Sequence, residues 1–534
     1  MPWLARVEEH RWPALVFGPL GAVVGAVLLL GEWKSAAALA VLVPAGLAML
    51  ALSRASWVGV IGAVVAVAVG AVLLTRPDVT MRAVALVAGL WLLLGSAALM
   101  ARRDGRWLGI LAAATGILLL FWPPITAFAV GTFLVLAGLV VVGRGRWPRI
   151  AAVAAAALLL AGGLVLEANF PHPDAFYAAP DHLTNAHGAL VRTEPFTRGV
   201  PAGARAWRIL YTTTRDDRTT TVASAVVVAA TSAPPGQRPV LVWAHGATGV
   251  ARDCAPSLTA DPVGTNSVPD ITEALAAGWV VIAPDYPGLG TAGPHPFLIG
   301  PGEARSLLDA VLAARGLTAL TLAPKTLVWG HSQGGNAALW TGILAPSYAP
   351  EAGLAGVAAL APGTGLPALA ALWGDGIYAA YLIEAYSETY PDVRFNAYVR
   401  AAARVPVREL ADRCLSDPKV YVSGLSSLLR GRSIWSAGPD TGPFGQRLRQ
   451  NVPDQPIAVP VLIGQGGSDT TVPVTVQNDY VRRECATGSR IDYRTYPGRE
   501  HVGILAGDSP LLPELMQWSR DRLAGAPAGS TCPA

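Results

Sequence analysis

The pattern of hydrophobic and polar positions divides the chain into two halves. From Leu15 to Leu166 the sequence is mostly Ala, Val, Leu and Gly, whereas beyond Asn169 charged residues occur at the density of a globular protein. Apolar runs fall at about 13–31, 36–52, 57–74, 81–100, 107–122, 124–142 and 148–166. Each approaches the roughly 20 residues that a helix needs to cross a bilayer, and the runs lack the polar stripes of a soluble bundle. We therefore expect an α-helical, multi-pass membrane domain over 1–168, with about seven transmembrane helices.

Charges between the runs predict the orientation of this domain. The cytoplasmic side of a membrane protein is enriched in Lys and Arg. One side here carries Arg6, Arg11, Arg54, Arg102, Arg103, Arg106, Arg144, Arg146 and Arg149, and the other carries Lys34, Arg76 and Arg82. The N-terminus is therefore expected in the cytoplasm and, after seven crossings, everything beyond Glu167 is expected outside. The fifth and sixth runs could instead form one re-entrant pair joined at Pro123-Pro124.

This apolar half is also repetitive. Trp12, Trp57, Trp107 and Trp147 each open a run, and "TRPDVT" at 75–80 echoes "FWPPIT" at 121–126. The repeat resembles the small six-helix acid-resistance membrane proteins (HdeD-like) over about 10–145, with a seventh helix added as a tether. No acidic residue or His lies deep in a run, where an ion path would need one. An anchor in the lipid bilayer is thus favoured over a transporter.

The polar half contains a motif of nucleophilic catalysis in "TLVWGHSQGG", from Thr326 to Gly335. A β-rich run, Thr326 to Trp329, meets G-x-S-x-G at 330–334, and "GNAALWTGILA" then has the composition of a helix. In this strand–turn–helix context the sharp turn exposes the serine at the helix N-terminus, where the helix dipole favours developing negative charge. Ser332 is the predicted nucleophile.

Two predicted strands precede the motif, and the loop after the first of them is expected to bind the oxyanion. The run Pro239–Gly249 ends in His-Gly, and the loop after this strand should supply a backbone N–H from Ala247 or Thr248, beside that of Gln333. His245 precedes the nucleophile in the chain, so we interpret it as a loop-shaping residue. Asp285 follows the next buried strand and is given a structural role.

The base and the acid follow from chain order, which in these folds is Ser, acid, His. After Ser332 the chain has a single histidine, His501, which follows a short predicted strand, Ile491–Tyr496. The acid should follow the preceding strand, predicted at Val459–Gly464, and Asp469 does so. Asp454 precedes that strand, and Asp479 falls in a helix-like stretch. Ser332, His501 and Asp469 therefore form the predicted triad, in which His takes the serine proton and the carboxylate orients the imidazole.

Short segments in order resemble the secretory lipase family of fungi and actinobacteria. They are "FYAAP" at 176–180, "RILYTTT" at 208–214, "AHGATGVARDCAPS" at 244–257, "APDYPGLG" at 283–290 and "GHSQGG" at 330–335. The resemblance covers about 170–534 and implies an α/β-hydrolase domain with a helical cap that acts on acylglycerols and other carboxylic esters. It implies the same triad and Gln333 as an oxyanion donor. The membrane half departs from the family pattern, since typical members are freely secreted.

The segment from about 364 to 450 is longer than the sheet requires and is expected to be the cap, within a hydrolase domain of 169–534. Its aromatic and aliphatic positions recur at helical spacing. We expect an apolar substrate pocket lined from this segment, or alternatively packing of cap against core. The candidates are Trp373, Tyr378, Tyr381 and Leu382.

All four cysteines lie in the polar half. An even number in a domain outside the cytoplasm predicts two disulfides, and sequence alone permits three connectivities. The family resemblance implies Cys254–Cys414 and Cys485–Cys532. No cluster of thiols and His has metal-ligand spacing, so neither a metal nor another cofactor is expected.

Composition changes this picture little. A formal net charge of +4 and the lack of a Lys/Arg-rich run argue against nucleic acid as a partner. The leading hypothesis is a membrane-anchored esterase or lipase acting on a small-molecule or lipid ester through an acyl-Ser332 intermediate. The same triad would serve an acyltransferase, amidase or peptidase. A membrane sensor or transporter with a ligand-binding hydrolase-like domain is the alternative outside enzymes.

Overall fold

The structure is a computed structural model that describes residues 171–533 apart from 185, 233–235, 265–266, 418–419 and 421–432, together with residues 110 and 113. The expected membrane domain, its orientation and its repeat lie outside the described residues. Within the described part of the chain, no helix has the length and apolar character needed to cross a bilayer. Contacts divide the chain into two units, and the one treated below comprises Pro171–Tyr398, Ala411–Val420 and Trp435–Ala534.

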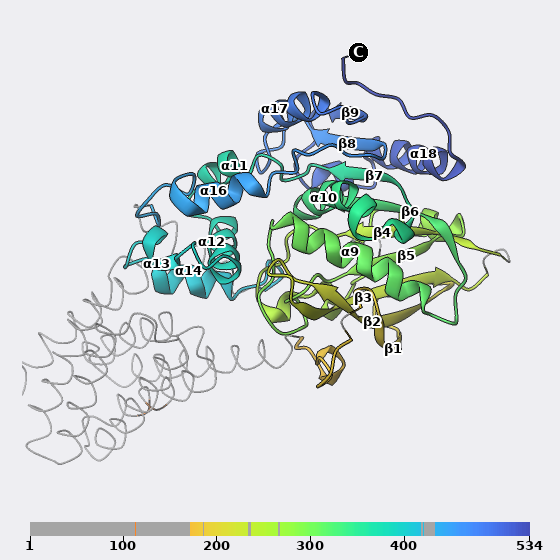
Figure 1. The fold of residues 1–534 in the computed structure, drawn as a ribbon, viewed down its shortest axis with the longest axis horizontal. Helices are drawn as coiled ribbons and strands as arrows, with labels where there is room; N and C mark the ends of the chain where they lie inside the picture. Colours follow the sequence, from red (N-terminus) through yellow and green to blue (C-terminus); the bar gives the residue numbers. More distant parts are fainter. Residues whose placement is uncertain are drawn as a thin grey trace, which may run out of the picture. The chain divides into compact units, whose positions relative to one another are not determined.

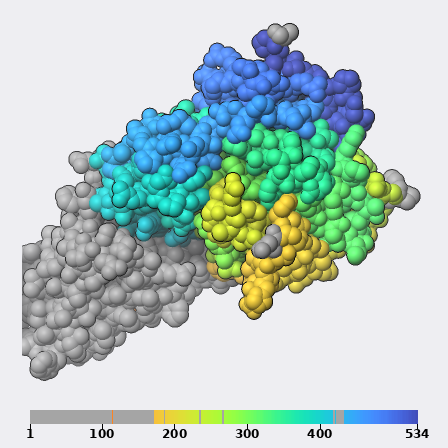
Figure 2. Space-filling view, viewed as in Figure 1, coloured from red at the N-terminus to blue at the C-terminus, as the bar shows by residue number. Residues whose placement is uncertain are grey.

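A nine-stranded mixed sheet forms the centre of this unit, in the order β1-β2-β3-β5-β4-β6-β7-β8-β9 (Figure 1). The strands are β1 Leu190–Phe196, β2 Ala204–Thr214, β3 Thr220–Ala230, β4 Arg238–Ala244, β5 Val280–Pro284, β6 Leu322–His331, β7 Leu354–Leu360, β8 Val461–Gly466 and β9 Ile491–Tyr496. Pairing is antiparallel from β1 to β5 and parallel from there to β9. In the space-filling view the first strands (yellow) and the C-terminal elements (blue) accordingly lie at opposite ends of the unit (Figure 2).

The central strands are covered on both faces, which explains their continuous apolar sequences. Every residue of β5 is buried, as is every residue of β8. On one face, side chains of α8 (Ile271–Ala276) and α18 (Leu511–Ala524) join alternate residues of β4 and β6 in a single hydrophobic cluster. The other face is covered by α9 (Gly300–Arg315) and α10 (Gln333–Tyr348), which pack against each other.

The predicted elements around the catalytic motif are present, with some changes in length. Strand β6 begins at Leu322, before the predicted Thr326, and α10 begins directly after Ser332. Strand β9 has the predicted bounds, and the helix-like stretch containing Asp479 is α17 (Val474–Cys485). The observed β8 is shifted by two residues from the predicted 459–464.

Between β7 and β8, where the cap was expected, the described residues are mainly helical. The helices of this unit are α11 Leu366–Leu372, α12 Ile377–Thr389, α13 Phe395–Tyr398 and α16 Gly442–Gln450. A further helix, α14 Arg404–Ala411, belongs to the other unit except for its last residue. Of these, α11 lies beside both α12 and α16 (Figure 1). Phe444 of α16 packs edge-on against Tyr386 and Tyr398, with ring centroids 5.4 and 5.3 Å apart. This segment therefore has its own small aromatic core. The remaining short helices are η2 Ala175–Tyr177, η3 Arg252–Cys254, η4 Pro256–Leu258, η5 Pro350–Ala352 and η6 Gly503–Leu505.

Candidate active site

Ser332 occupies the sharp turn between β6 and α10. Its backbone has φ 57° and ψ −115°, a region that residues other than glycine rarely adopt. A Cβ at Gly330 would collide with the carbonyl of Gly334, and one at Gly334 would collide with that of Ala244. The two flanking glycines thus permit a turn that places the serine at the N-terminus of α10.

His501 and Asp469 lie beside this serine although they are far away in sequence. The Oγ of Ser332 is 2.8 Å from Nε2 of His501, and Nδ1 of His501 is 2.8 Å from Oδ2 of Asp469. Both distances are those of good hydrogen bonds. The three predicted side chains therefore form one continuous chain, in which the serine can donate to the imidazole and the imidazole to the carboxylate.

The loop after β8 holds Asp469 in its charged form. The backbone N–H groups of Thr471 and Val472 donate to Oδ1 over 2.9 and 2.8 Å, and the Gln465 side chain donates to Oδ2 over 3.0 Å. Burial alone would raise the pKa of Asp469, but the hydrogen bonds and the proximity of His501 outweigh it and lower that pKa. The carboxylate is thus suited to stabilise a protonated imidazole.

His331, directly before the serine, is a site residue that the sequence analysis missed. Its Nε2 donates to the carbonyl oxygen of His501 over 2.9 Å, and the two rings lie 4.8 Å apart. Burial, together with nearby His501, lowers the pKa of His331 to about 4, so the ring is neutral near pH 7. Its place as the second residue of G-x-S-x-G was the only sequence signal for this contact between the two loops.

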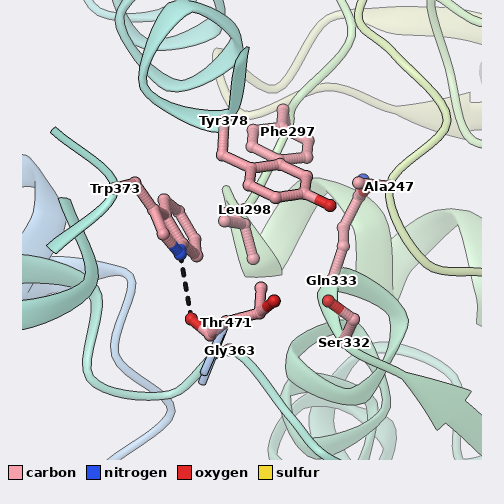
Figure 3. A pocket seen from close by; sticks show the side chains of 9 residues that line it. All are labelled: Ala247, Phe297, Leu298, Ser332, Gln333, Gly363, Trp373, Tyr378 and Thr471. Atoms are coloured by element: carbon pink, nitrogen blue, oxygen red, sulfur yellow. Dashed lines mark hydrogen bonds between the residues drawn. The ribbon is translucent and has the colours of Figure 1, made fainter. Parts of the chain in front are cut away.

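The predicted oxyanion donors meet at the serine. Ala247 and Gln333 line a small cavity together with Ser332 (Figure 3). Gln333 is the first residue of α10, where backbone N–H groups have no partner within the helix. Thr248 lines a second, larger cavity, and its carbonyl accepts a hydrogen bond from Leu415 over 2.8 Å. Ala247 is therefore the better placed of the two loop candidates.

The four predicted pocket residues separate into two pairs. Trp373 and Tyr378 line the small cavity with Ser332. Tyr381 and Leu382 are fully buried and belong to neither cavity at the serine. The Tyr381 hydroxyl instead donates to the carbonyl of Arg413 over 2.6 Å. The Tyr381 ring also packs edge-on against that of Phe297, which precedes α9, with centroids 5.7 Å apart. For Tyr381 the structure therefore favours the expected alternative, packing of the cap segment against the core.

Comparison with known proteins identifies the family of this chain. The secretory lipase family model matches residues 265–531. The chain belongs to the secretory lipase family. Lipase A of Moesziomyces aphidis is 26% identical over 362 residues, which cover 62% of this chain and 76% of that lipase. Lipase A of Arthroderma benhamiae is 30% identical over 312 residues, which cover 52% and 63% of the two chains.

Solved structures support the same fold. The closed state of Candida antarctica lipase A matches with a TM-score of 0.56 at 23% identity, covering 68% of this chain and 89% of that chain. The polar half therefore has the α/β-hydrolase fold, as the resemblance implied. The fold and the family together show that the protein is a lipase-like serine hydrolase. Membership of a secretory lipase family indicates an enzyme that acts outside the cytoplasm.

In this family member a buried polar cluster holds the side chain of Gln333. Its Nε2 lies 2.6 Å from Oε1 of Glu303 and 2.9 Å from Nε2 of His295. Burial raises the pKa of the Glu303 carboxyl to about 8, so it is mainly protonated near pH 7. Among the described residues Oε2 of Glu303 has no hydrogen-bond partner. Glu303, in the first turn of α9, was not found from the sequence, where it resembles any exposed helix residue.

This cluster predicts a pH-dependent stability. The unfolded state releases the Glu303 proton near the ordinary pKa of 4.5, whereas the folded state keeps it until about 8, so the folded protein loses stability as pH rises through this window. Glu303→Gln removes the titration. We expect its free energy of unfolding, relative to wild type, to rise by on the order of a few kcal/mol between about pH 5 and 9.

Urea denaturation at several pH values measures this difference. Glu273→Gln is the matched control, because Glu273 is half exposed on α8 and pairs with Arg520 at the surface. Parallel pH curves for wild type and Glu303→Gln would show that Glu303 is not the buried acid described here.

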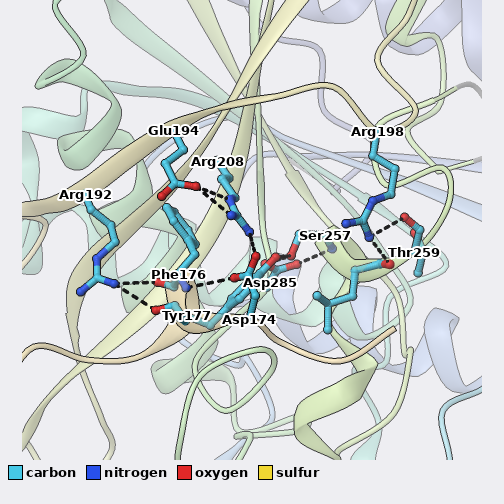
Figure 4. Close-up of polar contacts among 12 residues, drawn as sticks. Asp174, Phe176, Tyr177, Arg192, Glu194, Arg198, Arg208, Ser257, Thr259 and Asp285 are labelled. Carbon is cyan, nitrogen blue, oxygen red and sulfur yellow. Dashed lines mark hydrogen bonds and ion pairs between the residues drawn. The ribbon is translucent and has the colours of Figure 1, made fainter. Parts of the chain in front are cut away.

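Asp285 and His245 have the structural roles expected of them. Asp285 accepts hydrogen bonds of 2.6 Å from each of Ser224 and Ser257, and burial raises its pKa to about 6 (Figure 4). Tyr177 bonds to the same Ser257 over 2.8 Å, which fastens the start of the described chain to the lipase core. His245 is buried with its ring 4.4 Å from that of Tyr286, and burial lowers its pKa to about 4.

All four cysteines are paired as the family resemblance implies. Cys254 bonds to Cys414, joining the loop after Ala247 to the segment between β7 and β8. Cys485 bonds to Cys532, joining the end of α17 to the C-terminal tail. Gly249 contributes to the first bridge, because a Cβ there would overlap the sulfur of Cys254.

Proposed function

We propose that this lipase-like hydrolase cleaves carboxylic esters through an acyl intermediate on Ser332, with its catalytic domain outside the cytoplasm and its N-terminal helices in the membrane. The main observation in support of this reaction is the unbroken chain of hydrogen bonds from Asp469 through His501 to Ser332. A module that only bound a ligand would have no need of this arrangement at a strained turn beside two candidate oxyanion donors.

In the proposed reaction Ser332 is the nucleophile, His501 transfers protons in both half-reactions, and Asp469 stabilises the protonated imidazole. The Oγ of Ser332 attacks the ester carbonyl while Nε2 of His501 takes its proton, and Asp469 stabilises the resulting imidazolium. The backbone N–H groups of Gln333 and Ala247 bind the oxyanion. His501 then protonates the leaving alkoxide, which departs as an alcohol. Water, deprotonated by His501, hydrolyses the acyl-serine and restores the enzyme.

The proposal of a membrane anchor rests on the apolar half of the sequence. Its runs of near-spanning length and its bias of arginines support an HdeD-like domain over 1–168, with the hydrolase domain of 169–534 following it on the outer side. The two disulfides support the same location, because such bonds persist in oxidising compartments. The segment of 364–450 is proposed as the cap over the site.

One labelling experiment tests both the reaction and the location. We expect a membrane-impermeant fluorophosphonate to label the full-length wild-type protein in intact spheroplasts, with no gain after lysis. Ser332→Ala should remain unlabelled in both. Labelling only after lysis would overturn the proposed orientation and leave the hydrolase intact. No labelling of wild type under either condition would overturn Ser332 as the nucleophile.

A substrate panel then separates the possible uses of the same triad. Ester hydrolysis predicts release of free acid from simple esters, without dependence on an added acceptor alcohol. Turnover confined to amides, or product formed only with an added acceptor, would replace the proposed esterase by an amidase or an acyltransferase.

A further inference from the structure

Two cavities of very different size meet at Ser332. One has a volume of about 10 Å³ and is lined by residues that include Gln333, Trp373 and Tyr378 (Figure 3). The other has a volume of about 300 Å³ and is lined by residues that include His501 and its neighbour Val502. Ala247 and Tyr378 border both cavities. An ester bound at the serine must direct its acyl and alcohol parts into these unequal spaces.

The position of His501 determines which cavity receives the alcohol part of the ester and which receives the acyl part. The imidazole gives its proton to the leaving oxygen, so the alcohol part must lie on the same side of Ser332 as this ring. His501 lines only the large cavity, whereas Gln333, an expected oxyanion donor, lines only the small one. The large cavity is therefore on the alcohol side, and the small cavity is left for the acyl chain.

The acyl side is closed by a supported aromatic wall. The indole N–H of Trp373 donates to the carbonyl of Thr471 over 3.0 Å, and its ring lies 5.4 Å from that of Tyr378. Phe297 and Leu298 complete the wall, and both are buried. A space of about 10 Å³ admits about one water molecule, which is also the scale of a methyl group.

The alcohol side is wide and carries no permanent charge. Its walls include Trp243, Pro256, Pro284, Leu415 and Leu505, and none of the described residues that line it is Asp, Glu, Lys or Arg. The histidines beneath it, His245 and His331, are buried and neutral near pH 7, because burial lowers the pKa of each to about 4. Its volume of about 300 Å³ is roughly twice that of an apolar cavity of ~150 Å³ that holds one benzene ring.

We propose that the large cavity is the binding site for the alcohol part of the substrate, and that the protein prefers esters of a short acyl group with a bulky, uncharged, ring-containing alcohol. This inference rests on the proposed function of Ser332 and His501. Trp373 and Tyr378 are the specificity-determining residues on the acyl side.

A pair of isomeric esters tests this preference on the wild-type, full-length protein. In 2-naphthylmethyl acetate the two-ring group is in the alcohol, whereas in methyl 2-naphthylacetate the same group is in the acid. Composition and size are identical, so only placement differs. We expect kcat/KM for the acetate to exceed that for the methyl ester by about tenfold or more, as is typical when a pocket discriminates by size. Equal or reversed values would overturn the inference.

Two variants locate the preference in the structure. Tyr378→Ala should narrow the ratio by raising turnover of the methyl ester, because it removes part of the acyl-side wall. Thr259→Phe places a ring in the large cavity, which Thr259 lines, and should lower turnover of the naphthylmethyl ester several-fold more than that of ethyl acetate. Thr318→Phe, at an exposed position outside both cavities, is the matched control.

The outcomes distinguish this inference from the function beneath it. If no ester is hydrolysed and the fluorophosphonate does not label Ser332, the proposed function itself fails. If labelling and ester hydrolysis occur, but kcat/KM is equal for the two isomers or higher for the methyl ester, only the assignment of the cavities fails. The thermal melt of each variant checks that it is folded. The comparison of the two isomeric esters on the wild-type protein does not depend on the variants.

Discussion

Ser332→Ala and His501→Ala are each expected to lower kcat for ester hydrolysis by a factor on the order of 10⁶, with the double variant little worse than either. The reason is that the serine, the imidazole and the carboxylate form one hydrogen-bonded chain and act as a unit. Steady-state hydrolysis of an acetate ester by purified protein measures the loss, with circular dichroism to check the fold.

A carboxylate pair provides the control for this prediction. Asp469→Asn should lower kcat by a factor on the order of 10⁴, because the amide favours the wrong imidazole tautomer. Asp479→Asn, on the exposed face of α17 where the aspartate pairs with Arg482, should have no comparable effect. Substantial turnover by Ser332→Ala, after contaminating esterases are excluded, would contradict the assignment of the nucleophile.

Removal of the Cys254–Cys414 bridge is expected to have the next largest effect. The cysteines are 160 residues apart in sequence, and such a bridge restricts the unfolded chain enough to contribute about 2–5 kcal/mol to stability. The bridge also lies beside the hydrogen bond from Leu415 to the carbonyl of Thr248, next to the proposed oxyanion donor Ala247. In Cys254→Ser/Cys414→Ser we therefore expect lower stability together with a loss of kcat approaching a hundredfold, because a displaced donor no longer binds the oxyanion.

The second bridge is the matched control. Cys485 and Cys532 are 47 residues apart and join α17 to the tail, so Cys485→Ser/Cys532→Ser should lower stability with a much smaller loss of kcat. Urea denaturation gives the free energies, and initial rates below the transition give kcat. Equal catalytic losses in the two double variants would contradict a link between the first bridge and the oxyanion loop.

Local sequence was sufficient to predict the position of the nucleophile, because the motif that contains it is a local structure. Gly330 and Gly334 permit the turn through contacts with residues a few positions away or on the adjacent strand, so G-x-S-x-G with its flanking strand and helix already predicts where Ser332 lies. His501 followed by elimination, and Asp469 followed from strand order. The structure brings all three within hydrogen-bonding distance.

Long-range contacts around the site could not be read in the same way. Glu303 on α9 meets Gln333 on α10 only because both helices pack on one face of the sheet, and burial there is what raises the carboxyl pKa to about 8. His331 meets the loop of His501 across 170 residues of sequence. In the sequence each is one polar residue among many.

The cap segment illustrates the division between sequence and tertiary structure. Helical spacing in the sequence determined that Tyr378, Tyr381 and Leu382 share one face of α12, since residues three and four apart lie together on a helix. Only tertiary packing decided that Tyr378 borders the cavities while the other two are buried. The sequence by itself thus determined the nucleophilic turn and the triad, because these depend on local sterics and chain order, and its resemblance to secretory lipases implied the α/β-hydrolase fold of the polar half. The shape of the cavities, the neighbours of each buried polar group and its protonation were decided by the tertiary structure, because burial depends on segments that the sequence does not place side by side.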